Sequence, residues 1–456
     1  MLKGPAPAGR RGAGAFRRRH PAQLVVTAFA LAVAIGAILL WLPVAREGAG
    51  SASFLTALFT SASAVCVTGL VVVDTSAYWS SFGEIVILLL IQIGGFGIMT
   101  LASLLALFVY RNLGVRGKIL AQTETKALGL GDIRRVLLGV AVLSLVFEVV
   151  AAVSLTTRLM GSYEESLGRA LYLGVFHAVS AFNNAGFALY DDNLIGFVSD
   201  WWFVLTIGIT VIVGGIGFPV LLEVWQEKRQ PSRWSLHTKL TLAMTGGLLI
   251  VGTVMVLALE WTNPATLGDL SSPGKLLAGF FQGLTPRTAG FNSLDYAAMR
   301  ETTWLGTMLL MFIGGGSAST AGGVKVTTIA LIGAMVLAEA RGEENVNLMN
   351  RRVPGPAQRQ ALSVVIVGVA AVAAGAFFIM AMSKGALAPS LFEAVSAFGT
   401  VGLSTGITTE LSNGGRLIVI ALMFAGRVGP ITLGAALAMR EHRRLYKLPE
   451  ERPIIG

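Results

Sequence analysis

The chain contains little charge, one cysteine and few histidines. Of its 456 residues, 13% are Asp, Glu, Lys or Arg, whereas a soluble domain has about 25%. Cys66 is the sole cysteine, so no disulfide can form within the chain. There are four histidines and no CxxC, HExxH or P-loop motif. These absences argue against an enzyme that works in aqueous solution, although they leave intramembrane enzymes open.

Long apolar runs take the place of the missing charge, and 54% of the residues are hydrophobic. A helix that crosses a bilayer needs about 20 mostly apolar residues. Suitable runs lie at 22–44, 83–110, 133–158, 201–226, 236–261, 303–340, 360–383 and 415–439. The sequence therefore predicts an all-α polytopic membrane protein with eight transmembrane spans.

A shorter apolar segment lies between the first and second spans, and others lie between the third and fourth, the fifth and sixth, and the seventh and eighth. Each contains a glycine followed by a large apolar residue. The segments are FLTALFTSASAVCVTGLVVVD (54–74), YLGVFHAVSAFNNAGFALYDD (172–192), KLLAGFFQGLTPRTAGFNSLD (275–295) and LFEAVSAFGTVGLSTG (391–406). Each is predicted to be a half-membrane helix with an extended return, which is tolerated only where protein or a water-filled path surrounds it. The fold class is therefore four pseudo-symmetric helix–pore loop–helix repeats around a single central pore.

These repeats account for nearly all of the chain. Their predicted bounds are 22–110, 132–227, 236–340 with a broken last helix, and 359–440, between basic tails at 1–21 and 441–456. The net charge is +10, and most Lys and Arg residues fall in the tails and in the loops on the same side. This distribution predicts that both termini are cytosolic and does not require nucleic acid as a partner. Outer loops hold Asp74, Asp191, Asp192, Asp200 and Asp295, which would concentrate cations or are ordinary solvated charges.

The four glycine loops are the candidate ion-binding site. Thr400-Val401-Gly402 matches the Thr-Val-Gly core of potassium-channel filters, whose backbone carbonyls replace the hydration shell of the ion. Glycine reaches the unusual backbone of such a loop without steric cost. The predicted filter residues are Val67, Thr68, Gly69, Asn184, Ala185, Gly186, Thr288, Ala289, Gly290, Thr400, Val401 and Gly402. The C-terminal ends of the half-helices should point at the axis and favour a cation.

Two polar insertions interrupt the spans, and we interpret them as parts of a gate. The sixth span contains FIGGGSASTAGGVKVTT (312–328), which cannot form a straight helix facing lipid. The predicted gate residues are Gly314, Gly315, Gly316, Ser317, Ala318, Ser319, Thr320, Ala321, Gly322, Gly323, Lys325 and Arg427. Arg427, within the eighth span, either faces the pore as a barrier to cations or pairs with carbonyls of the broken span. A static kink and a snorkelling arginine are the alternatives.

Other polar residues within the apolar segments are less informative. Glu148 either pairs with a neighbouring helix or lines a cavity, and His177 is expected to be a packed, hydrogen-bonded side chain. Two further functions stay open, namely an alternating-access carrier for another cation or small solute and an intramembrane serine hydrolase. The hydrolase would use Ser317 or Ser319 and needs a base within hydrogen-bond distance.

The motifs VTGL (67–70), NNAGF (183–187), TPRTAGFNSLD (285–295), GTVGLS (399–404), GGGSASTAGGVKVTT (314–328) and GRVGPIT (426–432) resemble the Trk/Ktr/HKT superfamily of potassium transporters. The resemblance covers about residues 30–440 and all four repeats. Few residues precede the first span, which is more similar to the membrane subunit of a bacterial Ktr-type system than to Trk.

The resemblance implies uptake of K⁺ across the cytoplasmic membrane without enzymatic chemistry. Such subunits are homodimers in the membrane lipid, and they sit on a cytosolic ring of RCK-domain subunits that bind ATP and ADP. Sodium often activates transport. The resemblance assigns Gly69, Gly186, Gly290 and Gly402 to the filter and Arg427 to the gate. The chain has no Rossmann GxGxxG unit, so no organic cofactor is expected on it.

Overall fold

The computed structural model describes residues 21–111 and 133–439, and most of this part of the chain is helical. A long helix, a short helix and a second long or broken helix follow one another four times. The first two groups are α1 (Pro21–Trp41), α2 (Phe54–Cys66) and α4 (Ser81–Arg111), then α6 (Ile133–Tyr163), α7 (Leu167–Phe182), α8 (Trp201–Ile216) and α9 (Phe218–Gln226). The last two are α10 (Leu236–Glu260), α11 (Ser272–Leu284), α12 (Glu301–Phe312) and α13 (Val326–Ala340), then α14 (Gly355–Ser383), α15 (Leu387–Gly399) and α17 (Asn413–Met439).

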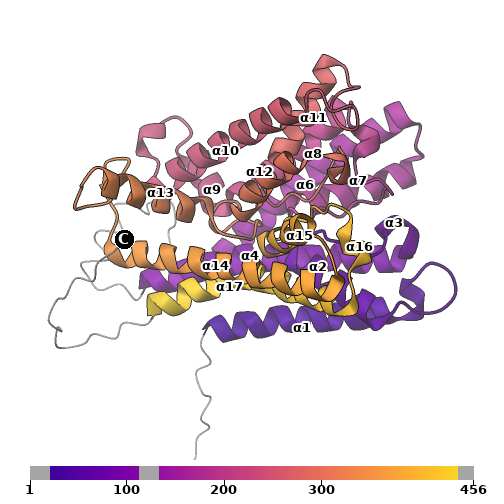
Figure 1. The fold of residues 1–456 in the computed structure, drawn as a ribbon, viewed down its shortest axis with the longest axis horizontal. Coiled ribbons are helices and arrows are strands. Elements are labelled where there is room, and N and C mark those ends of the chain that lie inside the picture. Colours follow the sequence, from indigo (N-terminus) through magenta and orange to yellow (C-terminus); the bar gives the residue numbers. More distant parts are fainter. Residues whose placement is uncertain (1–20, 112–132, 440–456) are drawn as a thin grey trace, which may run out of the picture.

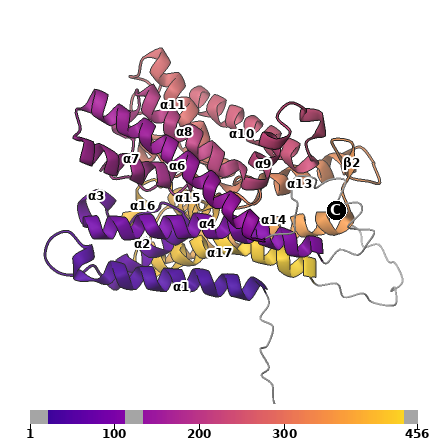
Figure 2. The same cartoon turned by 180° about the vertical axis from the view of Figure 1, so that it is seen from behind.

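Short elements connect these helices. They are η1 (Pro43–Ala45), α3 (Thr75–Tyr78), η2 (Ile195–Phe197), η3 (Pro231–Arg233), η4 (Tyr296–Ala298) and α16 (Ile407–Glu410). A two-stranded antiparallel hairpin of β1 (Asn347–Leu348) and β2 (Arg351–Arg352) follows α13 and pairs Asn347 with Arg352. In both views of the molecule, α3 and α16 lie at one end, whereas α9 and α13 lie at the other (Figures 1 and 2).

The lengths and compositions of the helices agree with a polytopic membrane protein. Within the described ranges, four helices are individually long and apolar enough to cross a bilayer, and α8 with α9 would make a fifth crossing. The four are Ser81–Thr100, Leu137–Tyr163, Leu236–Glu260 and Gly355–Ser383. Their outer faces carry exposed apolar side chains such as Leu89, Val153, Ile250 and Phe377. Such faces suit lipid, because hydrocarbon tails are as apolar as leucine.

The short helices α2, α7, α11 and α15 lie in the core and contribute to its largest apolar cluster. Three of them begin at a serine whose hydroxyl accepts a hydrogen bond from a backbone amide of the first turn. These N-caps are Ser53, Ser166 and Ser271. An N-cap of this kind stabilises a helix by about 1 kcal/mol, so the sequence itself sets where these half-length helices start.

The fourth predicted span, 201–226, is wrong as a continuous helix. The structure bends by 96° between α8 and α9. Gly217 at the bend has φ of +103°, and Pro219 follows within the first turn of α9. A glycine adopts this conformation readily, and proline is suited to the first turn of a helix. The sequence GIGFP therefore ends one helix and starts another.

Some predictions fall on residues that the structure does not describe. The predicted N-terminal tail lies outside the described residues except for Pro21, and the predicted C-terminal tail lies wholly outside them. The basic loop at 112–132 lies outside them as well.

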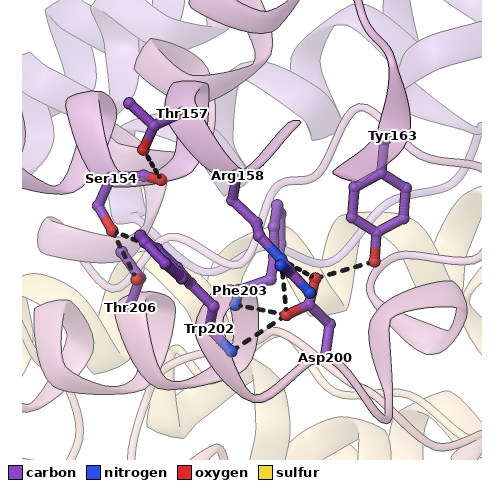
Figure 3. Close-up of polar contacts among 8 residues, drawn as sticks. All are labelled: Ser154, Thr157, Arg158, Tyr163, Asp200, Trp202, Phe203 and Thr206. Carbon is purple, nitrogen blue, oxygen red and sulfur yellow. Dashed lines mark hydrogen bonds and ion pairs between the residues drawn. The ribbon is translucent and has the colours of Figure 1, made fainter. Parts of the chain in front are cut away.

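Asp200, one of the acidic residues that we placed in the outer loops, caps α8 and forms an ion pair with Arg158. One carboxylate oxygen accepts hydrogen bonds from the amides of Trp202 and Phe203, at 3.0 and 3.1 Å. The other accepts from Arg158 Nε and from the Tyr163 hydroxyl, both at 2.9 Å (Figure 3). Burial of the carboxyl group opposes its ionisation, but these donors outweigh burial and lower its pKa. The cluster ties the C-terminal end of α6 to the start of α8.

We expect Asp200→Ala to lower the melting temperature of the purified protein more than Asp200→Asn does. Asparagine keeps an oxygen for the helix amides, whereas alanine removes the cap, which costs about 1 kcal/mol. Because the folded-state pKa of Asp200 is lowered, the contribution of its charge is present at neutral pH and is lost as the pH falls through that pKa. Thermal unfolding in detergent at several pH values measures both effects. Equal melting temperatures for the two variants at neutral pH would contradict the role of the cap.

Candidate functional site

The four glycine loops share one backbone conformation. Gly69, Gly186, Gly290 and Gly402 have positive φ values of +89°, +70°, +75° and +94°. The residue two positions before each glycine is also left-handed, although none of these residues is glycine. These residues are Val67, Asn184, Thr288 and Thr400, with φ between +50° and +69°. Such a conformation is uncommon for residues with a side chain, so its occurrence at the same place in all four loops indicates a common structural requirement.

The four glycines lie in a closed ring, which we call the glycine ring. A Cβ atom added to Gly69 would lie 2.4 Å from the carbonyl oxygen of Ala185. One added to Gly186 would lie 2.6 Å from the Cα atom of Gly290. A Cβ atom on Gly290 would lie 2.6 Å from the carbonyl oxygen of Val401. One on Gly402 would lie 2.2 Å from the carbonyl oxygen of Thr68 in the first loop, which closes the ring. No Cβ atom fits at such distances, so the four backbones meet around one axis only because all four residues are glycine.

Buried hydroxyl groups at the ends of three of the short helices hold the loops that follow them. The Ser63 hydroxyl accepts a hydrogen bond from the amide of Gly69 at 3.1 Å, and the Ser180 hydroxyl donates to the carbonyl of Phe187 at 2.8 Å. Thr285 donates in the same way to the carbonyl of Phe291. The helices therefore end beside the ring, and the partial negative charge at a helix C-terminus favours a cation there.

An open cavity of about 310 Å³ lies on the side of the ring where the loops leave it. Gly69, Gly186 and Gly402 are among its lining residues. Asp74, Asp191, Asp192 and Asp295 also line it, and they come from the first three repeats. We call this cavity the vestibule. Its carboxylates give it a negative potential, which raises the local concentration of cations.

Loop 314–323 covers the other side of the ring, where the loops enter it. A Cβ atom on Gly322 would lie 2.0 Å from the Thr400 hydroxyl, and one on Gly323 would lie 3.3 Å from the Cα atom of Gly399. The Thr320 side chain lies 3.1 Å from the amide group of Asn184. Residues 314–316 and 319–323 are buried. The loop is therefore in direct contact with the second and fourth glycine loops.

The bend at Gly217 is the counterpart of this loop. The amide of Gly316 donates to the carbonyl of Gly215 at 2.8 Å, and the amide of Phe218 donates to the carbonyl of Ala318 at 3.3 Å. A Cβ atom on Gly217 would lie 2.6 Å from the Ser317 carbonyl oxygen. Two broken helices thus satisfy each other's backbone groups, as buried irregular backbone must.

Arg427 is 1% exposed and binds backbone carbonyls. Its guanidinium donates to the carbonyl of Thr320 in the loop and to that of Gly94 in α4, the latter at 3.2 Å. Lys325 donates to the carbonyl of Ala321. Of the alternatives that the sequence left open, the structure has the arginine paired with the broken span. A snorkelling arginine is wrong.

Sequence reasoning did not identify the partners of two other buried polar residues. Arg287, beside the third glycine loop, donates to the backbone carbonyl and the hydroxyl of Thr245, at 3.0 and 3.2 Å. Glu148 accepts hydrogen bonds from Gln92 at 3.0 Å and from Asn183 at 3.3 Å. The motif TPRTAGF could have pointed to Arg287, since an arginine within a pore loop is exceptional. Nothing in the sequence could have identified its partner on α10.

The contacts of the histidine and of the two serines give no support to a hydrolase. His177 bonds the carbonyl of Leu173 at 2.8 Å and the amide of Leu189 at 3.2 Å, so both ring nitrogens are engaged. Ser319 donates to the carbonyl of Gly316 at 2.7 Å. The Ser317 hydroxyl lies 3.3 Å from that of Thr327. A serine nucleophile needs a base within such reach, and these hydroxyls contact a carbonyl and another hydroxyl.

Comparisons with known proteins identify the family of the chain. The model of the family TrkH, described as cation transport protein, matches residues 7–443. The chain belongs to this family. It is 42% identical to the Ktr system potassium uptake protein B of Bacillus subtilis, over 94% of this chain and 95% of the relative. Identity to the protein of that name from Vibrio alginolyticus is 38%, over 95% and 94% of the two chains.

A second group of relatives is more distant. Identity to the potassium/sodium uptake protein NtpJ of Enterococcus hirae is 33%, over 96% of this chain and 98% of the relative. The crystal structure of the potassium transporter TrkH from Vibrio parahaemolyticus superposes with a TM-score of 0.70, covering 93% of this chain and 86% of that one. At 17% identity, that likeness shows the shared fold.

We expect Gly217→Ala to destabilise the protein, because its Cβ atom would collide with loop 314–323 and its φ is unfavourable for alanine. Gly246→Ala, on α10, is the matched control, since nothing lies within 4 Å of the added atom. Replacing a helical glycine in open space by alanine stabilises by up to about 1 kcal/mol. Thermal unfolding in detergent should therefore give a lower melting temperature for Gly217→Ala and an equal or higher one for Gly246→Ala. If both variants melt like the wild type, the contact between the bend and the loop does not contribute to the stability of the fold.

Proposed function

We propose that this chain is the pore-forming subunit of a potassium uptake system. The observation that carries the proposal is the closed glycine ring, in which four backbone loops surround one axis between an acidic vestibule and a buried loop. Relatives that match nearly the whole chain are named potassium uptake proteins, and these names support K⁺ as the transported ion. In this proposal K⁺ is cargo, and the chain carries out no covalent chemistry.

The carbonyl groups of the glycine loops form the selectivity filter. The proposed residues are those at 67–69, 184–186, 288–290 and 400–402. Carbonyl oxygens from four loops can replace the water around a dehydrated K⁺ ion. The loops differ in sequence, so the four glycines provide the most regular ring of the filter. The C-terminal ends of α2, α7, α11 and α15 add partial negative charge beside the ion path.

Loop 314–323 is the proposed gate. It lies directly against the filter loops at Thr400 and Asn184, and its backbone is freed from helical constraint by five glycines. Arg427 and Lys325 hold its carbonyls. Hydrogen bonds from a charged donor to a buried carbonyl stabilise by about 1.5–3 kcal/mol each. In the proposed mechanism these bonds hold the loop closed, and they break when the ion path opens.

The larger assembly follows from the family resemblance. We propose a homodimer in the cytoplasmic membrane with both termini cytosolic, bound to a cytosolic RCK-domain ring that senses ATP and ADP. Activation by Na⁺ is part of the proposal, and the name of the potassium/sodium uptake relative is compatible with it. The repeats span 22–110, 132–227, 236–340 and 359–440.

Gly402→Ser should abolish selectivity for K⁺ over Na⁺. A Cβ atom at this position would lie 2.2 Å from the Thr68 carbonyl oxygen, so the ring cannot keep its geometry. Cation flux into proteoliposomes that contain the purified chain measures the effect. Gly161→Ser, where nothing lies within 4 Å of the added atom, is the control and should transport like the wild type. Absence of K⁺ flux from wild-type vesicles, with or without the regulatory ring, would contradict the proposed function.

Arg427→Ala should raise basal K⁺ flux by about tenfold, because it removes a charged donor that holds loop 314–323 closed. Deletion of residues 316–321 should raise it at least as much. Arg416→Ala is the matched control, since Arg416 lies on the same helix and bonds carbonyls at 409 and 411 rather than the loop. An unchanged flux in both the Arg427 variant and the deletion would argue against the gate.

A further inference from the structure

A polar side chain lies on each of the four short helices, three residues before a buried Ser or Thr near the end of the helix. In the first three repeats the hydroxyl of that Ser or Thr holds the glycine loop. The four polar residues are Thr60, His177, Gln282 and Glu393. All four are buried, and the last three have no exposed surface. A buried polar group costs free energy unless it is hydrogen-bonded, so the bonds that these side chains make indicate why they are there.

In the second and third repeats this side chain holds the chain just after the glycine ring. His177 Nε2 accepts a hydrogen bond from the amide of Leu189, three residues after Gly186. The Gln282 oxygen, with its amide group oriented to suit its neighbours, accepts from the amides of Ser293 and Leu294 at 2.9 and 2.8 Å. Both side chains therefore fix the direction in which the backbone leaves the ring.

The fourth repeat uses a carboxyl group for the same purpose. Glu393 Oε2 accepts a hydrogen bond from the Ser404 hydroxyl at 3.0 Å, and Oε1 accepts from the Thr408 hydroxyl at 2.6 Å. The two hydroxyl oxygens are 2.8 Å apart. The Ser404 oxygen also accepts from the amide of Gly406 at 3.1 Å. The carboxyl group and the two hydroxyl groups thus contact one another pairwise, beginning two residues beyond Gly402.

Glu393 differs from its counterparts in its partners. His177 and Gln282 bond backbone amides, whereas Glu393 bonds two side chains that line the vestibule. Among the described residues, no Lys or Arg forms an ion pair with Glu393. A buried carboxyl group without a cationic partner is costly. Its bonds to Ser404 and Thr408 are therefore what keeps it in this place.

We propose that Glu393 is a positioning residue for ion selection. Through Ser404 and Thr408 it fixes the outer exit of the fourth glycine loop, and so the direction of the Val401 and Gly402 carbonyls. This inference rests on the proposed function, because it concerns how the same ring discriminates between ions. Glu393 does not touch the ion in this proposal. It acts on the filter only through its hydrogen bonds to Ser404 and Thr408.

The test is the ratio of K⁺ to Na⁺ flux in proteoliposomes, measured together with the concentration dependence of K⁺ flux. Glu393→Ala should lower the ratio by about tenfold, since it removes two hydrogen bonds to a buried carboxyl group. Glu393→Gln should restore the ratio to within about twofold of the wild type, because an amide accepts from one hydroxyl and donates to the other. A side chain that only filled space would not distinguish alanine from glutamine through selectivity.

Two further variants test the route through the hydroxyls. The double variant Ser404→Ala, Thr408→Val keeps the carboxyl group but removes its partners, and it should lower the ratio as much as Glu393→Ala. Adding Glu393→Ala to it should produce no further fall, because residues that act as a unit are not additive. Ser390→Ala is the matched control. Ser390 is buried on the same helix, and its hydroxyl has no hydrogen-bond partner among the described residues.

The outcomes separate this inference from the proposed function. If wild-type vesicles take up K⁺ selectively and Glu393→Ala keeps the wild-type ratio, the inference is overturned and the proposed function stands. If Glu393→Ala does not fold, the hydroxyl variant decides, and an unchanged ratio there overturns the inference as well. If the wild type transports neither ion, the proposed function itself fails.

Discussion

Four backbones come into contact at the glycine ring, and the surrounding helices are arranged to hold them there. The hypothetical Cβ distances of 2.2–2.6 Å leave no room for a side chain at any of the four positions. Positive φ at these glycines and at the residues two before them turns each loop sharply at the same place. Such conformations persist only when the surroundings over-determine them. The half-length helices, their serine caps and their buried hydroxyls provide those surroundings.

The four loops of the ring share one backbone conformation, but the side chains that hold them differ from repeat to repeat. Hydroxyls hold the ends of the loops in three repeats through bonds to different atoms. Behind them, an imidazole, an amide and a carboxyl group hold the three later loops at their exits. A single chain permits such differences, whereas four identical subunits would repeat one solution. Each loop is therefore held by a different set of hydrogen bonds.

Broken helices below the ring satisfy each other's backbone. The bend at Gly217 and loop 314–323 exchange hydrogen bonds, and Arg427 joins the loop to α4. Unsatisfied peptide groups are expensive inside a membrane protein, so neither break would be stable without the other. Movement of the loop must therefore disturb the bend and the arginine together, which links the loop to two neighbouring helices.

The class of protein, the order of long and short helices and the places of the four glycines could all be predicted from the sequence. Apolar length, repeated half-helices and glycine position are local properties, so they can be read without a fold. Gly217 and Pro219 mark a break between α8 and α9 in the sequence, but only the structure shows the 96° angle of the bend, the carbonyls at 320 and 94 that Arg427 binds, and the place of Glu393 beside the fourth loop. Asp200, placed by its charge in the outer mouth, was found in an ion pair with Arg158. In each of these cases the deciding partner is distant in sequence or hidden in a run that reads as uniformly apolar. Local pattern shows that a buried polar group needs a partner, and only packing in three dimensions selects which one it has.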